Sequence, residues 1–361
     1  MNAAVISLGS VSCDWIIKEM ENYFDKVDLI DIKYLEISFS GKKAEILYKG
    51  KPFGKYDCVH TLGSFRYANL LNALTIIMPD CVFMTKKASA YTVSHDKLLT
   101  QLALQKNNIP MPKTYVASTT EAARSIFGQV NYPIIMKFPQ GTQGKGVLVA
   151  ESFASASSIM DALSYLRQPF IIQEFIDTGG KDIRAFVVGD EVVASYQREA
   201  KQNEIRSNIH QGGTGKAIEL DDESKKLAVK AAKSVGAKIC GVDILMSVHK
   251  GPLVLEVNVS PGLQGITKYT GINVAEIIAK YLYEETRKLK DKENGEGMKD
   301  ILSTLKKEEG EIASLITNLD FRSGRVLLSN LITKTAKLKE DDDYEIHIKD
   351  GEILIKRFKI N

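Results

Sequence analysis

Short apolar runs of strand length alternate with a helical pattern over the first ninety residues of the chain. Apolar residues fill Ala3–Leu8 and recur in Val27–Ile32, and a helix-period pattern lies between them from about Cys13 to Tyr23. A further apolar run, Asp57–Gly63, leads into a glycine turn. This strand–helix–strand order predicts an α/β domain over residues 1–90.

A second set of elements follows over residues 91–288. A helical pattern from Ser94 to Asn108 ends at Ile109-Pro110, a sequence that stops helices. A hairpin is expected at the turn Val188–Glu191, and another at Lys250-Gly251. Strands are expected at 132–138, 146–150, 170–175, 183–188, 191–195, 240–246 and 253–258, and helices at 153–167, 222–236 and 273–288.

The composition changes after this region. Residues 289–310 are dense in charge and predict a solvated linker or an exposed helix. In residues 311–361, Tyr344–Lys349 and Ile353–Arg357 alternate in strand fashion around Asp350-Gly351, a strong hairpin signal. We predict a small β-rich module there. Its lysine clusters suit either an acidic partner or solvated strand faces, and oligomerisation is an alternative role.

Bulk composition narrows the classes of protein. The 361 residues are 44 % hydrophobic and 26 % charged, with a net charge of +3 that gives no reason to expect nucleic acid. No run of 18 apolar residues predicts a membrane span, and the first residues lack a secretory pattern. The four cysteines fit neither a zinc site nor a disulfide framework. We therefore expect a cytoplasmic protein.

A glycine-rich loop follows the lysine at the end of one predicted strand. Lys137 precedes Gly141, Gly144 and Gly146, whose backbone N–H groups can converge on an anion, while the lysine meets a phosphate as a point charge. The order G-x-x-G-x-G is neither a Walker A loop nor G-x-G-x-x-G. An ordinary hairpin turn is the alternative.

Three oxygen-bearing residues lie on two adjacent predicted strands. Glu256 and Asn258 are two apart and face the same side, and Asp243 lies on the preceding strand. Such ligands suit Mg²⁺, which keeps its other positions for water and phosphate. Half-exposed polar positions are the alternative.

Three arginines bracket the predicted strands between 182 and 210. Arg184, Arg198 and Arg206 have the bidentate geometry that recognises phosphates or carboxylates. For any one of these arginines taken alone, a surface ion pair is the better explanation.

Taken together and in order, these segments resemble the motifs of RimK-type ATP-grasp ligases over about residues 90–282. The segments that carry the resemblance are Ser94–Lys97, Lys137–Gly146, Gln173–Ile176, Asp182–Asp190, Arg206–Gly213, Gly241–Leu245 and Glu256–Leu263. The resemblance implies an ATP-grasp fold: an N-terminal α/β domain over residues 1–90, then central and C-terminal α+β subdomains within 91–288. The linker 289–310 and the β-rich module 311–361 lie outside this common core.

The resemblance also implies roles for individual residues. Lys97 and Lys137 contact the ATP phosphates, and the loop 139–146, with Gly144 and Gly146, closes over them. The adenine lies against the hinge Gln173, Glu174 and Phe175, and Asp182 approaches the ribose. The triphosphate is lined by Arg206, Ser207 and Asn208, and Mg²⁺ is held by Asp243, Glu256 and Asn258. Arg184 and Arg198 stabilise the acyl-phosphate step. Mn²⁺ is the alternative ion.

The activity implied is ATP-dependent ligation of a carboxylate to an amine through an acyl phosphate. Glutamate is the favoured amino acid, the acceptor is a peptide, a protein C-terminus or a small carboxylate, and a homo-oligomer (dimer or tetramer) is expected. A ligase of small-metabolite biosynthesis and a catalytically silent ATP-binding regulator are the alternatives. One departure is Gln264, where RimK-type proteins usually carry Glu. Either the incoming amine is recognised differently here, or the change is neutral.

Overall fold

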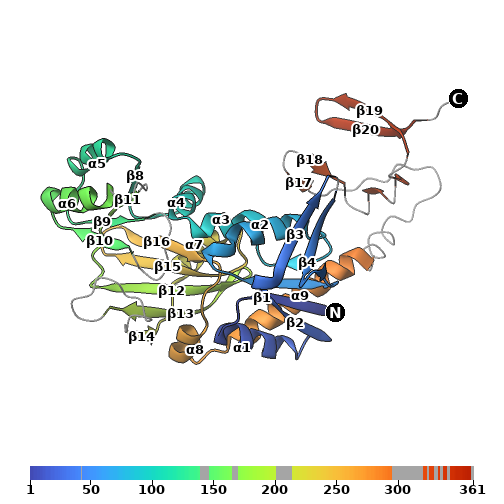
Figure 1. The fold of residues 1–361 in the computed structure, drawn as a ribbon, viewed down its shortest axis with the longest axis horizontal. Helices are drawn as coiled ribbons and strands as arrows, with labels where there is room; N and C mark the ends of the chain where they lie inside the picture. The colour runs from blue at the N-terminus through green and yellow to red at the C-terminus, as the bar shows by residue number, and fades with distance from the viewer. Residues whose placement is uncertain are drawn as a thin grey trace. The chain divides into compact units, whose positions relative to one another are not determined.

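The computed structural model describes most of the chain (Figure 1). Residues 1–41, 43–138, 146–164, 170–200, 214–294, 320–322, 325–328, 332–333, 336–339 and 342–358 are described. The chain divides into two units, Met1–Thr286 and Arg287–Asn361. Four predicted site residues lie outside the described residues: Gly144, Arg206, Ser207 and Asn208.

The N-terminal part contains a parallel sheet, which agrees with the α/β architecture that its strand–helix–strand pattern predicted. Its strands run in the order β2-β1-β6-β7, with bounds Lys26–Asp31, Asn2–Ser7, Cys58–Leu62 and Phe83–Met84. Helix α1 (Val11–Met20) begins after Ser10, whose hydroxyl accepts a hydrogen bond from the Cys13 N–H. The chain adds β2 on one side of β1 and β6 on the other, so the strand order reverses between β1 and β6. Open α/β sheets bind ligands at such topological switch points.

A second small sheet in this part was not predicted. Strands β3 (Leu35–Ser40), β4 (Lys43–Tyr48) and β5 (Lys51–Pro52) form an antiparallel sheet. The short helices η1 (Ile32–Tyr34) and η2 (Phe65–Tyr67) and the helix α2 (Ala68–Ile77) were also missed.

The single helix expected from Ser94 to Asn108 is wrong at its start. The structure has two helices, α3 (Ala88–His95) and α4 (Lys97–Lys106). Asp96 between them is extended, at φ −115° and ψ 115°, and its carboxylate accepts from the Leu98 and Leu99 N–H groups. Asp96 therefore caps a new helix and sets Lys97 at its first position.

The central subdomain is a four-stranded antiparallel sheet in the order β10-β9-β11-β8. One side is covered by α5 (Thr120–Phe127) and α6 (Phe153–Ser164), and Phe127, Met136 and Met160 are buried in the core between them. Lys137 ends β9, beside the glycine-rich segment. The strand bounds are Val147–Ala150 (β10), Ile134–Lys137 (β9), Phe170–Glu174 (β11) and Thr114–Ala117 (β8).

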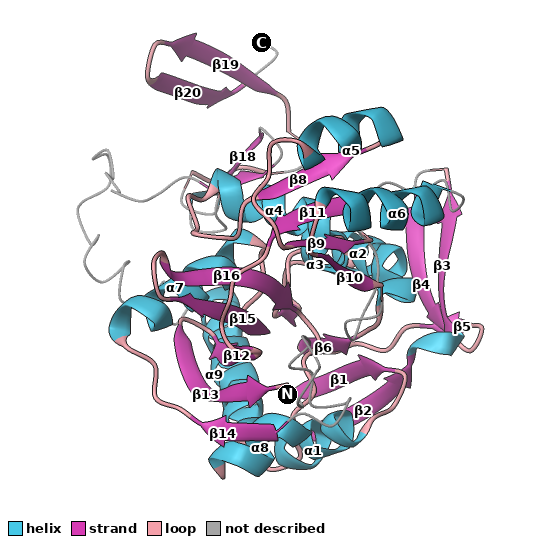
Figure 2. Ribbon diagram, turned by 90° about the vertical axis from the view of Figure 1, so that its left-hand side faces the viewer, coloured by secondary structure: helices cyan, strands magenta, loops and turns pink. Residues whose placement is uncertain are grey.

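The third sheet has five strands in the order β14-β13-β12-β15-β16, and both predicted hairpins are confirmed in it. Helix α7 (Asp222–Ser234) packs on one face, where Ile183, Ala185 and Val187 alternate inward from β12. The helices α8 (Gln264–Thr270) and α9 (Val274–Asn294) follow (Figure 2). The strand bounds are Thr214–Ala217 (β14), Glu191–Glu199 (β13), Lys181–Val188 (β12), Ile239–Ser247 (β15) and Gly251–Asn258 (β16).

The second unit contains two hairpins among its described residues. Strands β17 (Asp320–Arg322) and β18 (Arg325–Leu327) pair with each other, as do β19 (Tyr344–Lys349) and β20 (Glu352–Arg357). The latter confirms the hairpin predicted at Asp350-Gly351. Within the described ranges, no helix combines the length and apolar character needed to cross a bilayer.

Candidate active site

Strand register brings charged side chains from four strands onto one face of the third sheet. Asp182 on β12 pairs with Arg198 on β13, and Arg184 on β12 pairs with Asp243 on β15. Asp243 in turn pairs with Glu256 on β16. Directly opposed residues share a face of the sheet, and this is the face opposite to α7.

Acidic and basic groups alternate across this face in a connected network. Arg198 binds Asp182 through two hydrogen bonds of 2.6 Å each. Arg184 binds Asp243 through two of 2.7 Å, and the second guanidinium nitrogen of Arg198 lies 2.7 Å from Oδ2 of Asp243. Arg184 also lies 3.9 Å from Oε1 of Glu256. Such bidentate pairs fix both partners in a defined geometry.

The network separates the proton affinities of its two neighbouring carboxylates. Burial alone would raise the pKa of Asp243, but the charges and hydrogen bonds of Arg184 and Arg198 hold it well below its ordinary value. Burial and the negative charge of Asp243 raise the pKa of Glu256, although 47 % of its side chain remains exposed. Glu256 is therefore the accessible carboxylate of the pair.

The three predicted metal ligands lie on one face of β15 and β16. Asn258 is two residues beyond Glu256, and its amide oxygen accepts from the Ser260 N–H at 2.9 Å. In the described part of the chain, no three His, Cys, Asp or Glu side chains form a metal cluster. Two carboxylates and an amide nevertheless fit Mg²⁺, which takes oxygen ligands and retains water and phosphate.

The two predicted phosphate lysines come within electrostatic reach of this acidic edge. Lys137 is buried and donates to Oε1 of Gln173 at 2.7 Å. Burial lowers its pKa to about 8, Glu256 opposes this shift, and the charge of Lys97 adds to it. Burial also lowers the pKa of Lys97, against the raising influence of Glu256. The same carboxylate thus acts on both lysines.

The predicted adenine hinge is held by its own side chains. Gln173 donates to the Thr114 hydroxyl at 2.8 Å while it accepts from Lys137. Glu174 accepts from the Lys113 N–H at 3.2 Å and forms an ion pair with Lys250. Phe175, directly after β11, is half-buried.

Two predicted residues have surroundings that the sequence did not indicate. Asp182 was expected beside a ribose, and both of its carboxylate oxygens are bound by Arg198. Gly146 has φ +75°, and a Cβ there would lie 3.0 Å from the Phe138 ring. Its backbone therefore requires glycine.

Sequence reasoning missed an aromatic pair on the same face. Tyr196, which opposes Arg184, stacks on Tyr269 of α8 with centroids 5.8 Å apart. A Cβ at Gly215 would lie 2.5 Å from the Tyr269 ring, so the pair closes over β14 as well. The two-residue alternation from Arg198 could have placed Tyr196 on this face. Nothing in the sequence indicated Tyr269.

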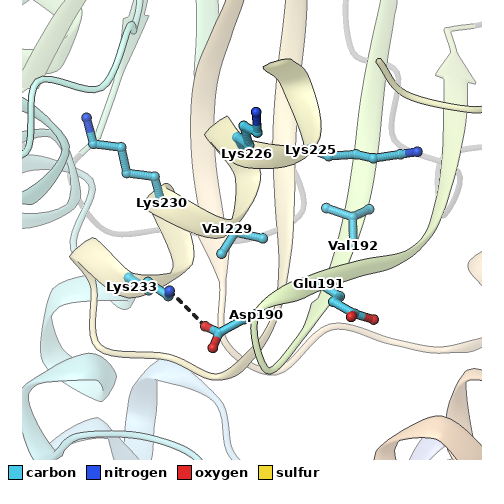
Figure 3. Close-up of a pocket in the computed structure, with 8 residues that line it drawn as sticks. All are labelled: Asp190, Glu191, Val192, Lys225, Lys226, Val229, Lys230 and Lys233. Carbon is cyan, nitrogen blue, oxygen red and sulfur yellow. Dashed lines mark ion pairs between the residues drawn. The ribbon is translucent and has the colours of Figure 1, made fainter. Parts of the chain in front are cut away.

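A separate groove of about 530 Å³ lies along α7, beside the turn between β12 and β13 (Figure 3). Lys233 pairs with Asp190 across it at 2.8 Å. Because α7 covers the other face of the sheet, this groove is not formed by the charged network. It is lined by Asp190, Glu191, Val192, Lys225, Lys226, Val229, Lys230 and Lys233.

The fold is that of the ATP-grasp ligases. The RimK domain protein from Sphaerobacter thermophilus superposes with a TM-score of 0.60 at 19 % identity, over 78 % of this chain and 99 % of that one. The D-alanine-D-alanine ligase from Coxiella burnetii gives 0.58 at 14 % identity, over 84 % and 99 %. The ATP-grasp ligase PsnB, in a complex with a precursor variant, Mg and ADP, gives 0.62 at 19 % identity, over 79 % and 98 %.

Sequence relatives are closer. A family model described as the RimK-like ATP-grasp domain matches residues 94–282. Proteins named probable alpha-L-glutamate ligase from Shewanella loihica and Cellvibrio japonicus are 36 % and 38 % identical, each over 75 % of this chain and 91 % of the relative. The chain therefore belongs to the RimK-like ATP-grasp family, as its motifs predicted. It is an ATP-dependent ligase that forms amide bonds.

Proposed function

We propose that the chain uses Mg²⁺–ATP to join glutamate, through its amino group, to a carboxylate acceptor. The observation that carries this proposal is that Glu256 lies within electrostatic reach of both Lys97 and Lys137. This puts a carboxylate of the expected metal site near the two lysines expected to bind phosphate. The relatives named as glutamate ligases support the choice of amino acid. The acceptor is a peptide, a protein C-terminus or a small carboxylate.

The proposed roles are those that the family resemblance implies for these residues. Lys137 and Lys97 hold phosphate oxygens, while backbone groups of Gln173–Phe175 bind the adenine. Asp243, Glu256 and Asn258 would hold Mg²⁺, which neutralises phosphate charge when bound. Gly144, Arg206, Ser207 and Asn208 remain predicted nucleotide contacts, and Asp182, bound to Arg198, remains the predicted ribose neighbour.

Ligation then proceeds in two displacements. The acceptor carboxylate attacks the γ-phosphorus, the bond to the β-phosphate oxygen breaks, and an acyl phosphate and ADP form. The amine nitrogen attacks the acyl carbon, phosphate leaves with the electrons of the C–O bond, and the nitrogen releases a proton to give the amide. Arg184 and Arg198, held rigidly by carboxylates, would stabilise charge on the transferring group without reorganising.

The test is ADP release from Mg²⁺–ATP with each of the 20 amino acids, with and without a cell-extract small-molecule fraction. We expect glutamate to stimulate turnover, Glu256→Ala to abolish it, and Glu191→Ala, on the outer turn, to retain it. Stimulation by a different amino acid would refute the choice of glutamate but not the ligase activity. Silence with tight ATP binding favours the catalytically silent regulator, or an acceptor such as a protein tail.

Adding peptides as candidate acceptors to the same assay separates the remaining alternative. Full activity with the small-molecule fraction, and none with peptides, would favour a ligase of metabolite biosynthesis. The cytoplasm remains the proposed location, supported by four cysteines that are all free thiols. Mn²⁺ in place of Mg²⁺ in this assay tests the alternative ion.

A further inference from the structure

The loop after β16, the strand that carries two of the predicted metal ligands, is held by the N-terminal domain near the switch point between β1 and β6. The loop, Val259–Leu263, runs from Asn258 to α8. The Gly63 N–H, after β6, donates to the Ser260 hydroxyl at 3.2 Å. Ser12, in the first turn of α1, contacts the other end of the loop. Helices α1 and α8 lie side by side in both ribbon views (Figures 1 and 2).

The Ser12 hydroxyl accepts one hydrogen bond and donates another. Its oxygen accepts from the Leu263 N–H at 2.8 Å, and its hydrogen is donated to Oε1 of Gln264 at 3.0 Å. A hydroxyl has one hydrogen and two lone pairs, so this use is complementary. Ser12 is 6 % exposed and Leu263 is fully buried. The contact joins positions 252 residues apart in the sequence.

The same loop and helix also border the charged network. A Cβ at Gly241, opposite Asn258, would lie 3.3 Å from Pro261 and 3.4 Å from Arg184. Farther along, α8 carries Tyr269, which stacks on Tyr196. A shift of the loop at Leu263 would therefore move one wall of the site.

We propose that Ser12 and Gln264 form a latch that positions this loop and α8 for the incoming amino acid. The inference rests on the proposed ligation. Gln264 acts through its acceptor oxygen and its connection to the loop, so it is a positioning residue. The nucleotide lysines lie on other elements, and Asn258 is held within the sheet by its pairing with Gly241, so we expect the latch to affect the amino acid more than ATP.

Steady-state kinetics with glutamate as the varied amino acid test the latch. Gln264→Ala should raise KM for glutamate about 3- to 10-fold, the range expected for one lost hydrogen bond, and Ser12→Ala, which removes two, should raise it at least as much. Both should leave KM for ATP within about twofold. The double variant should be no worse than Ser12→Ala, because Ser12→Ala already removes the bond that Gln264→Ala removes. Gln264→Glu keeps an acceptor oxygen and should retain the KM of the unaltered protein within about twofold.

The matched control is Asn273→Ala, which removes another contact of α1, its 3.0 Å bond to Glu19, without touching the loop. It should leave both KM values unchanged. Additive losses, equal effects on both substrates, or a Gln264→Glu variant as impaired as Gln264→Ala would each overturn the proposal. A melting temperature lowered without a KM split would also do so.

Hydrogen exchange judges the latch independently of turnover. A peptide covering residues 259–266 should exchange about 3- to 10-fold faster in Ser12→Ala and Gln264→Ala, and unchanged in Asn273→Ala. Faster exchange in a protein without amino-acid-stimulated turnover would refute the proposed function while the latch stands. Equal exchange in all variants would refute the latch itself.

Discussion

Nucleotide binding should be accompanied by uptake of a proton at Lys137. Its ammonium is buried and bonded to a neutral amide oxygen, and burial lowers its pKa to about 8. Phosphate charge beside it would restore a pKa near the ordinary 10.4. The expected uptake is about 0.1 proton at pH 7, about 0.5 at pH 8 and about 0.9 at pH 9, by proton linkage.

Isothermal titration calorimetry with Mg²⁺–ADP, repeated in buffers of different ionisation enthalpy, measures this uptake. In Lys137→Arg, whose side chain stays protonated, the proton uptake on binding at pH 8 should be smaller by about half a proton. Lys97, whose pKa is also lowered, accounts for any remaining uptake. Lys226→Arg, on α7 over the other face of the sheet, is the control. Uptake that is flat with pH, or identical in Lys137→Arg, would show that this lysine does not meet the phosphates.

Four further outcomes are expected. Asp243→Asn should cost about 3–5 kcal/mol in urea unfolding and at least about a hundredfold in turnover, because it leaves buried Arg198 and largely buried Arg184 underpaired; a stable, active variant would contradict this. Gly215→Ala should destabilise the protein by about 1–3 kcal/mol through the Tyr269 ring, and Tyr269→Ala should abolish that difference. Burial lowers the pKa of Lys86 to about 7 in the folded protein. Between pH 7 and 10.5 the unfolded chain therefore binds more protons than the folded one, and the free energy of unfolding should rise with pH. Lys86→Met should flatten that slope in unfolding curves, and an unchanged slope would refute the assignment. Light scattering of the full chain, and of one ending at residue 295, tests the predicted homo-oligomer; an unchanged oligomer would exclude the C-terminal module as the contact.

Local patterning was sufficient for most of the site's strands. Two-residue alternation placed Glu256 and Asn258 on a common face, and the strand register bears this out. The same alternation would also have placed Asp182 and Arg184 together, but it was not applied to them. It could not show that Asp182 is bound by Arg198, because that depends on register between strands. The site assignments themselves stay predictions until tested by substitution.

Other features were not predicted because their sequence signals are weak, or because they depend on tertiary contacts that leave no local signal. Leu35–Ser40 and Lys43–Tyr48 do alternate around a turn, and this hairpin was recoverable from the sequence. The break at Asp96 depends on a capping bond inside an otherwise helical pattern. The contact between Ser12 and Gln264 has no sequence signal at all, since it exists only after two distant segments pack together.

The alternating charges of the third sheet also constrain how this chain can evolve. Asp182, Arg198, Asp243, Arg184 and Glu256 form a series in which each charge has a partner on the next strand. A neutral replacement at any interior member removes one charged partner from each of its two neighbours in a largely buried setting. Viable substitutions here must occur as compensating pairs on adjacent strands, so the effects of single changes should be strongly epistatic. Homologous sequences that differ in this series should therefore differ at two of its positions together.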